Sequence, residues 1–104
     1  MAEHFNQLTP AQAERLAILA EEAGEIVQAV GKILRHGYDN YNPANRDINN
    51  RLALCHEIGD LQAVVEDMVK HGDVLGGTID KQKVEKLRRL SVGTLYLHHQ
   101  RDEV

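Results

Sequence analysis

Residues 9–37 read TPAQAERLAILAEEAGEIVQAVGKILRHG, and this stretch decides the fold class. Thr9 followed by Pro10 is typical of a helix start, because threonine caps free backbone N–H groups and proline fits the first helical position. Gly37 is a typical helix stop. Between them, apolar residues recur at steps of mostly three and four, which predicts a helix over about residues 10–36. This apolar series comprises Leu16, Leu19, Ala20, Ala23, Val27, Val30 and Leu34.

A loop and a second helix are expected next. Residues 37–46 read GYDNYNPANR, and their Gly, Pro, Asp and Asn content predicts a loop. Asp47 is a suitable N-cap for a helix that runs to about His71 and stops at Gly72.

A third helix is expected after the glycine-rich residues 72–78, starting near Thr78 or Ile79. Its apolar side comprises Val84, Leu87, Leu90 and Leu95. The sequence therefore predicts an all-α helix bundle: one domain over residues 1–104, with three principal helices and room for a short fourth. Three such helices bury only part of their apolar surface in one protomer, so we expect a homo-oligomer, either a dimer or a tetramer.

Composition and charge limit the classes of partner. The 104 residues are 42% hydrophobic and 27% charged, as in ordinary globular proteins, and the net charge of −4 argues against a nucleic-acid polymer. Cys55 is the only cysteine, which excludes an internal disulfide and a multi-thiolate metal site, and it is expected to fill space in the core. Because no apolar run approaches the roughly 18 residues that span a bilayer, we expect a cytoplasmic protein without a membrane partner.

Two acidic pairs lie beside apolar residues on the first two helices. Glu22 and Glu25 follow Ile18 at steps of four and three, so the three side chains share one row along the first helix. On the second helix, Glu57 interrupts an otherwise apolar row, and Asp60 lies on the edge of that row. This second row comprises Leu54, Glu57, Leu61, Val64 and Met68.

Four clustered carboxylates need a positive partner. Burying an ionised carboxylate costs several kcal/mol unless it is paired or binds a cation, and these helices carry few basic residues near the acids. A divalent cation is the simplest solution, although acidic pairs at this spacing are also common on solvated helix faces. Hard oxygen donors without a Glu-x-x-His motif favour Mg²⁺ or Mn²⁺ over zinc or a di-iron centre.

At these residues the sequence resembles the all-α nucleoside triphosphate pyrophosphohydrolases of the MazG-like superfamily, especially small phage and bacterial members. Their motif, Glu-Glu-x-x-Glu followed by Glu-x-x-Asp, reads here EEAGE over residues 21–25 and EIGD over residues 57–60. The stretches GKILRHGYDNYNP and YLHHQ look similar as well. The spacer between the two motifs is longer than usual, which lengthens the loop but leaves both acidic pairs intact.

The resemblance implies Mg²⁺ binding by Glu22, Glu25, Glu57 and Asp60, and cleavage of a nucleoside triphosphate between its α- and β-phosphates. A carboxylate that is not fully used as a ligand can accept a proton from the attacking water, and both Glu21 and Glu25 are candidates. Two alternatives remain: a phosphoribosyl-ATP pyrophosphohydrolase of the same superfamily, and a non-enzymatic helical module that binds metal or a basic partner.

A triphosphate also needs positive partners from the protein. Residues 78–104 are the net-basic part of the chain, and within them Lys83 and Lys86 are candidates for binding phosphate. Lys32 and Arg35, at the end of the first helix, are further candidates. An alternative interpretation is that these side chains form solvated helix faces.

The loop over residues 37–46 is a candidate for nucleoside binding. Tyr38 and Tyr41 can stack on a base, and Asn42 and Asn45 can form hydrogen bonds with its edge. A plain surface turn is the alternative. The six histidines are expected to be surface residues.

Overall fold

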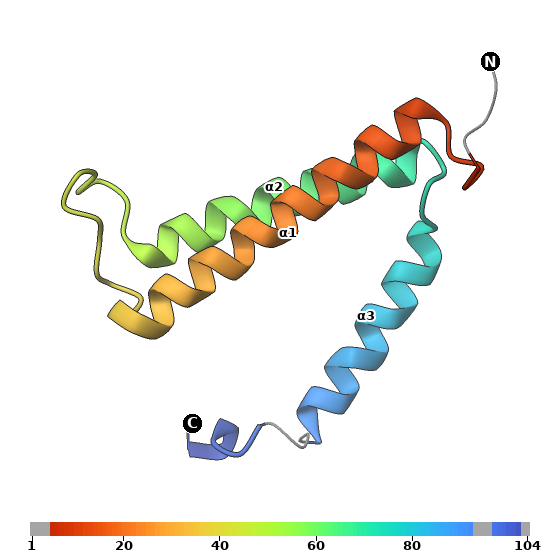
Figure 1. The fold of residues 1–104 in the computed structure, drawn as a ribbon. Coiled ribbons are helices and arrows are strands. Elements are labelled where there is room, and N and C mark those ends of the chain that lie inside the picture. The colour runs from red at the N-terminus through yellow and green to blue at the C-terminus, as the bar shows by residue number, and fades with distance from the viewer. Residues whose placement is uncertain (1–4, 93–96, 103–104) are drawn as a thin grey trace. The chain divides into compact units, whose positions relative to one another are not determined.

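The computed structural model describes residues 5–92 and 97–102 (Figure 1). Its elements are α1 (Pro10–His36), α2 (Asn50–Lys70), α3 (Gly76–Ser91) and a short 3-10 turn, η1 (Gln100–Asp102). Within the described residues there is no strand, only an isolated antiparallel bridge between Tyr41 and Asn49. The predicted all-α class with three principal helices is confirmed. No helix in this described part of the chain is long and apolar enough to cross a bilayer.

The boundaries of α1 are those that the sequence predicted. Thr9 Oγ1 accepts a hydrogen bond from the backbone N–H of Gln12, and the Gln12 side chain accepts one from the N–H of Thr9 in return. At the other end, Gly37 has a φ of 89°, in the left-handed region that favours glycine. Its N–H donates to the carbonyl of Ile33 at 2.7 Å, which closes the last turn.

α2 and α3 begin at other residues than predicted. The N-cap of α2 is Asn49, not Asp47, because Asn49 Oδ1 accepts the N–H of Leu52 at 2.9 Å. α3 starts at Gly76, before Thr78, and its N-cap residue Leu75 makes no side-chain hydrogen bond. The missing cap explains why the sequence did not mark this start. Leu95 lies outside the described residues.

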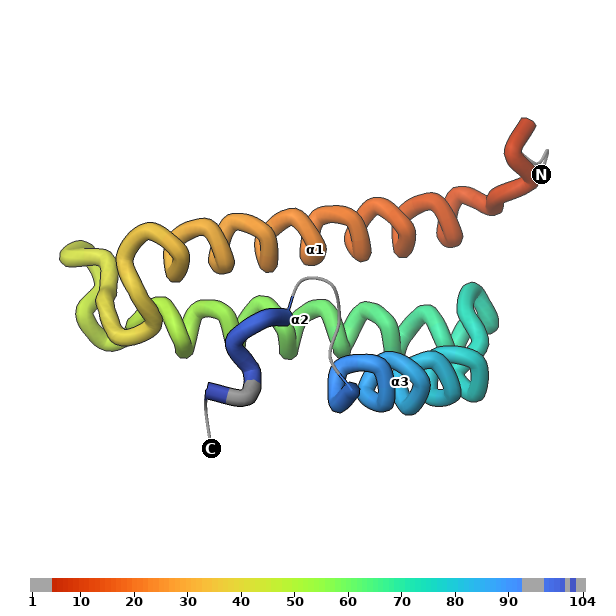
Figure 2. The backbone as a smooth tube through the Cα atoms, turned by 90° about the horizontal axis from the view of Figure 1, so that it is seen from below, coloured from red at the N-terminus to blue at the C-terminus, as the bar shows by residue number. Residues whose placement is uncertain are grey.

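The chain divides into two compact units, residues 1–73 and residues 74–104. In the first unit α1 and α2 lie side by side and antiparallel, as Figure 1 and Figure 2 both show, and we call this pair the hairpin. The second unit contains α3 and η1. The expectation of a single domain over residues 1–104 stays a prediction.

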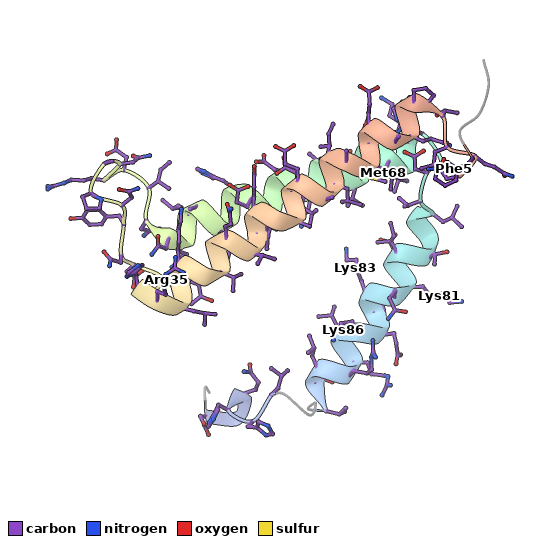
Figure 3. All side chains as sticks on the ribbon, viewed as in Figure 1. Phe5, Arg35, Met68, Lys81, Lys83 and Lys86 are labelled. Carbon is purple, nitrogen blue, oxygen red and sulfur yellow. The ribbon has the colours of Figure 1, made fainter. Side chains whose placement is uncertain are left out.

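α2 packs against α1 through the row that its sequence predicted. Met68 is the most deeply buried residue of this row, at 1% exposure, and it lies toward the C-terminal end of α2 (Figure 3). Leu54, Leu61 and Val64 are half-buried, as is Glu57 in the middle of the row. Glu57 therefore occupies an interface position, as the apolar residues around it suggested.

The apolar series of α1 is not the row that packs against α2. Most of this series is exposed, with Val27 at 71% and Leu34 at 81%, whereas the buried residue of α1 is Ala29, four residues after Glu25. One neighbouring helix covers only a narrow row of side chains, and in the hairpin this is the row of Ala29 and the acids. Cys55, which was expected in the core, is likewise exposed.

An ion pair ties the open end of the hairpin. The Arg15 guanidinium donates to both carboxylate oxygens of Asp73, whose side chain is only 7% exposed. This hydrogen-bonded pairing holds the pKa of Asp73 below its ordinary value of 3.8. Because the pKa is lower in the folded state, the contribution to stability is present above pH 3.8 and is lost as the pH falls through the folded value.

Arg15→Ala is therefore expected to lower the Tm at pH 7, because it leaves a largely buried carboxylate without its partner. At pH 3, below the ordinary value of 3.8, the same substitution is expected to have a smaller effect, because the contribution of the pairing diminishes as the pH falls below that value. Thermal melts of the wild type and the variant at both pH values measure the difference. An equal loss of Tm at pH 7 and pH 3 would contradict the assigned role.

Candidate metal centre

The hairpin brings four carboxylates together midway along the two helices. Glu22 and Glu25 come from α1, Glu57 and Asp60 come from α2, and one oxygen of each lies within 4.8 Å of the others. We call these four residues the carboxylate cluster. In the rest of the described chain, no three Asp, Glu, His or Cys side chains approach one another in this way.

Two oxygens of the cluster are buried without a partner. Glu22 Oε2 and Glu57 Oε2 are shielded from water and accept no hydrogen bond from any residue that the structure describes. Nor does any of the four carboxylates form an ion pair with a described basic side chain. Unpartnered buried carboxylate oxygens are costly, so the cluster lacks a positive partner that its geometry calls for.

Mutual repulsion and burial raise the pKa of two members. The pKa of Glu22 is raised, first by its removal from water and then by the negative charges of Glu25 and Asp60. The pKa of Glu57 is raised mainly by Glu25, which stabilises the protonated form through a hydrogen bond, and then by burial. The protein alone therefore resists full ionisation of the cluster.

The donor set fits a hard divalent cation. All four ligands are carboxylates, and opposite oxygens around Mg²⁺ or Ca²⁺ are separated by about twice the metal–oxygen distance, roughly 4.2 to 5 Å. The 4.8 Å limit of the cluster is compatible with this separation. The cluster contains no sulfur or nitrogen ligand that would select a softer metal.

Glu21 is positioned differently from its neighbour Glu22. It is exposed and does not belong to the carboxylate cluster, although its charge contributes to the raised pKa of Glu22. Glu25, the other candidate for accepting a proton, is half-buried within the cluster. The two candidates thus differ in whether they lie with the expected ligands or outside them.

Two cavities adjoin the carboxylate cluster. A small one of about 80 Å³ is lined by Glu25, Lys32 and Glu57, among others. A larger one of about 660 Å³ lies between the end of α1, the loop before α2 and the start of α2, and we call it the loop cavity. Glu57 and Lys32 line both cavities, so the loop cavity reaches the carboxylates through Glu57.

Five of the predicted substrate-binding residues line the loop cavity, namely Lys32, Arg35, Tyr41, Asn42 and Asn45. Figure 3 shows Arg35 at the end of α1, beside the loop. Lys83 and Lys86 instead lie exposed on α3, in the second unit (Figure 3).

Tyr38 does not line the loop cavity, although the sequence suggested it as a base-stacking residue. Its ring is covered by the Arg51 guanidinium, 4.4 Å from the ring centre, and its carbonyl accepts the N–H of Arg51 at 2.9 Å. Arg51 also pairs with Asp39 at 3.3 Å. Through these contacts Arg51 of α2 binds the first residues of the loop. Of Tyr38 and Tyr41, it is Tyr41 that lines the cavity.

The loop cavity is also lined by residues that were not among the predicted binding residues. Asn40 and Asn50 line it, and so do His36 and His56, which are exposed as expected. The many asparagines of the loop suggested hydrogen bonding with a ligand, but which of their amides line the cavity depends on how the loop turns. Asn50 N–H, for example, donates to the carbonyl of Asn40 at 2.8 Å and brings the two ends of the loop together.

Comparison of this chain with family models, curated proteins and solved structures gives no match. The resemblance to MazG-like pyrophosphohydrolases therefore stays a prediction from the motif over residues 21–25 and 57–60.

Proposed function

We propose that this chain is a cytoplasmic, Mg²⁺-dependent nucleoside triphosphate pyrophosphohydrolase, with Mn²⁺ as an alternative metal. The observation that carries the proposal is the carboxylate cluster, with two buried, unpartnered oxygens, at the end of a cavity lined by Lys32 and Arg35. Carboxylates that hold a divalent cation next to basic side chains match the charge pattern of a metal-bound polyphosphate.

In this proposal the four carboxylates hold the metal ion. Bound there, Mg²⁺ would neutralise phosphate oxygens and lower the pKa of an attacking water. Lys32, which borders both cavities, binds phosphate between the cluster and the loop cavity, and Arg35 binds it further toward the loop.

In this proposal a carboxylate accepts the proton of the attacking water, and the two candidates are Glu21 and Glu25. Glu25 lies within the carboxylate cluster and is also an expected metal ligand, whereas the exposed Glu21 lies outside the cluster and is not. Glu21→Gln separates the two possibilities: a fall in kcat with unchanged metal affinity assigns the base to Glu21, and an unchanged kcat assigns it to Glu25.

The proposed activity is tested with a panel of nucleoside triphosphates and Mg²⁺, the products being separated by anion exchange. The expected products are a nucleoside monophosphate and pyrophosphate, and EDTA is expected to stop the reaction. Orthophosphate release would overturn the assignment of the cleaved bond. Mg²⁺ binding without turnover of any nucleotide would instead favour a non-enzymatic metal-binding module.

We also propose that the enzyme is a homo-oligomer whose copies meet at the outer face of α1. Val27, Val30 and Leu34 follow one another at steps of three and four and therefore share this face, with exposures of 71%, 39% and 81%. A continuous apolar face of this kind is characteristic of surfaces that associate. Size-exclusion chromatography with light scattering is expected to show a dimer or tetramer at micromolar concentration, and a monomer would overturn the proposal.

A further inference from the structure

The loop cavity has a chemical character that the metal centre does not explain. Its volume of about 660 Å³ lies within the range of sites that hold whole small molecules. A single phosphate group needs much less room. The cavity is therefore large enough for the nucleoside part of a nucleotide whose phosphates reach the carboxylate cluster past Glu57.

Two asparagine amides of the cavity have a fixed orientation. Asn40 Oδ1 accepts the backbone N–H of Tyr41 at 2.9 Å, and Asn42 Oδ1 accepts the backbone N–H of Ala44 at 2.9 Å. Since only the oxygen of an amide can accept these bonds, the Nδ2 groups remain available as donors. The loop thus presents two amide donors at defined positions.

Several hydrogen-bond donors line the cavity. Lys32 and Arg35 can only donate, and they add to the amide donors of Asn40 and Asn42. Acceptors line the cavity too: Asn50 Nδ2 donates to the carbonyl of Gly37 at 2.9 Å and leaves Oδ1 as an acceptor, and the Glu57 carboxylate lies at the end next to the carboxylate cluster. Beside Asn40 and Asn42, however, a complementary ligand presents acceptor groups, as phosphates and carbonyl-bearing bases do.

The cavity also offers apolar contact for a flat ring. Tyr41, Pro43 and Ile48 line it together with the amides. The Tyr41 ring is free of the cation stacking that occupies Tyr38, and this residue is 42% exposed. A phosphate gains nothing from these apolar groups, whereas a base can stack on them.

We propose that the loop cavity binds the nucleobase, and that the amide donors of Asn40 and Asn42 favour bases with carbonyl oxygens, such as guanine and uracil, over adenine. Adenine has no carbonyl group and presents an amino donor to the same amides. This inference rests on the proposed nucleotide hydrolysis. It assigns Asn40 and Asn42 as specificity-determining residues.

The test compares kcat/KM for GTP and ATP, which are both purine nucleotides and differ at the base edge. The wild type is expected to prefer GTP by about tenfold or more, since leaving hydrogen-bonding groups unpaired in a binding site costs at least this much. Asn42→Asp keeps an oxygen for the N–H of Ala44 and replaces the donor with an acceptor. We expect it to lower the ratio of kcat/KM for GTP to kcat/KM for ATP by about tenfold.

Asn49→Asp is the matched control. It introduces the same charge in the same loop region, aspartate caps a helix as well as asparagine does, and Asn49 does not line the cavity. Its ratio of GTP to ATP is expected to equal that of the wild type. A general effect of negative charge on phosphate binding changes both substrates alike and cancels in the ratio.

The outcomes separate this inference from the proposed function. Pyrophosphate release with a wild-type ratio near one, or with a ratio that neither Asn42→Asp nor Asn40→Asp changes, overturns the inference and leaves the function standing. An equal loss for both nucleotides would place phosphates, not the base, in the cavity. No pyrophosphate from any nucleotide overturns the proposed function and this inference with it.

Discussion

Glu57→Gln is expected to lower kcat/KM for pyrophosphate release by about 10²- to 10³-fold, because a metal contributes several kcal/mol of charge stabilisation and Gln weakens its ligation. Glu57 is the member of the carboxylate cluster that borders both cavities and carries a buried, unpartnered oxygen. The helices should remain folded, since Gln preserves the shape of the side chain and removes a repelling charge. Steady-state kinetics and circular dichroism measure the two effects.

Glu66→Gln provides the control for this substitution. Glu66 is an exposed residue of the same helix and lies outside the carboxylate cluster. The change in charge and shape is identical, so the activity is expected to stay at the wild-type level. If both variants lost activity equally, the effect would come from the net charge of α2 and not from the cluster.

Mg²⁺ is expected to stabilise the folded protein, because the cluster exists only when α1 and α2 are paired. At a free concentration of a hundred times its Kd, a ligand that binds only the folded state contributes about 2.7 kcal/mol. The Tm should therefore rise on adding Mg²⁺ and fall again with EDTA. Glu57→Gln should abolish most of this rise.

The pH dependence of this stabilisation has a definite sign. In the metal-free protein the pKa values of Glu22 and Glu57 are raised above the ordinary 4.5, so the folded state holds protons that the unfolded state has released. The metal-free protein therefore loses stability as the pH rises from 4.5 through these raised values. Metal binding requires deprotonated ligands, so the rise in Tm with Mg²⁺ should be larger at pH 8 than at pH 5.

Thermal melts with EDTA or Mg²⁺ at both pH values test this prediction. An equal rise at pH 5 and pH 8 would contradict the assignment of the cluster as the metal site. The Arg15–Asp73 pair does not affect the comparison between pH 5 and pH 8. Its contribution to stability is lost only as the pH falls below 3.8, the ordinary pKa of Asp73.

The bounds of α1 could be predicted because each end depends on local chemistry. The capping box of Thr9 and Gln12 and the left-handed Gly37 involve residues that are close in sequence. α3 lacks such a cap, since Leu75 makes no side-chain hydrogen bond, and its start at Gly76 was missed. A helix boundary can therefore be predicted from the sequence where a local cap marks it.

The face on which α1 packs could not be read from hydropathy alone. The series containing Val27 and Leu34 is the more apolar one, yet the row of Ala29 and the two glutamates faces α2. A single neighbouring helix buries one narrow row, and the choice between two adjacent rows depends on the partner. The apolar series of α1 is exposed, and we propose that it packs against another copy of the chain.

The amino-acid sequence by itself determined the helical class and the two acidic pairs, because helical spacing of three and four residues puts each pair on one face. Only the tertiary structure decided that the four carboxylates meet within 4.8 Å, and that Tyr41, not Tyr38, lines the cavity beside them. Such contacts depend on how two helices cross and how the loop between them turns. No spacing along a single helix encodes those distances.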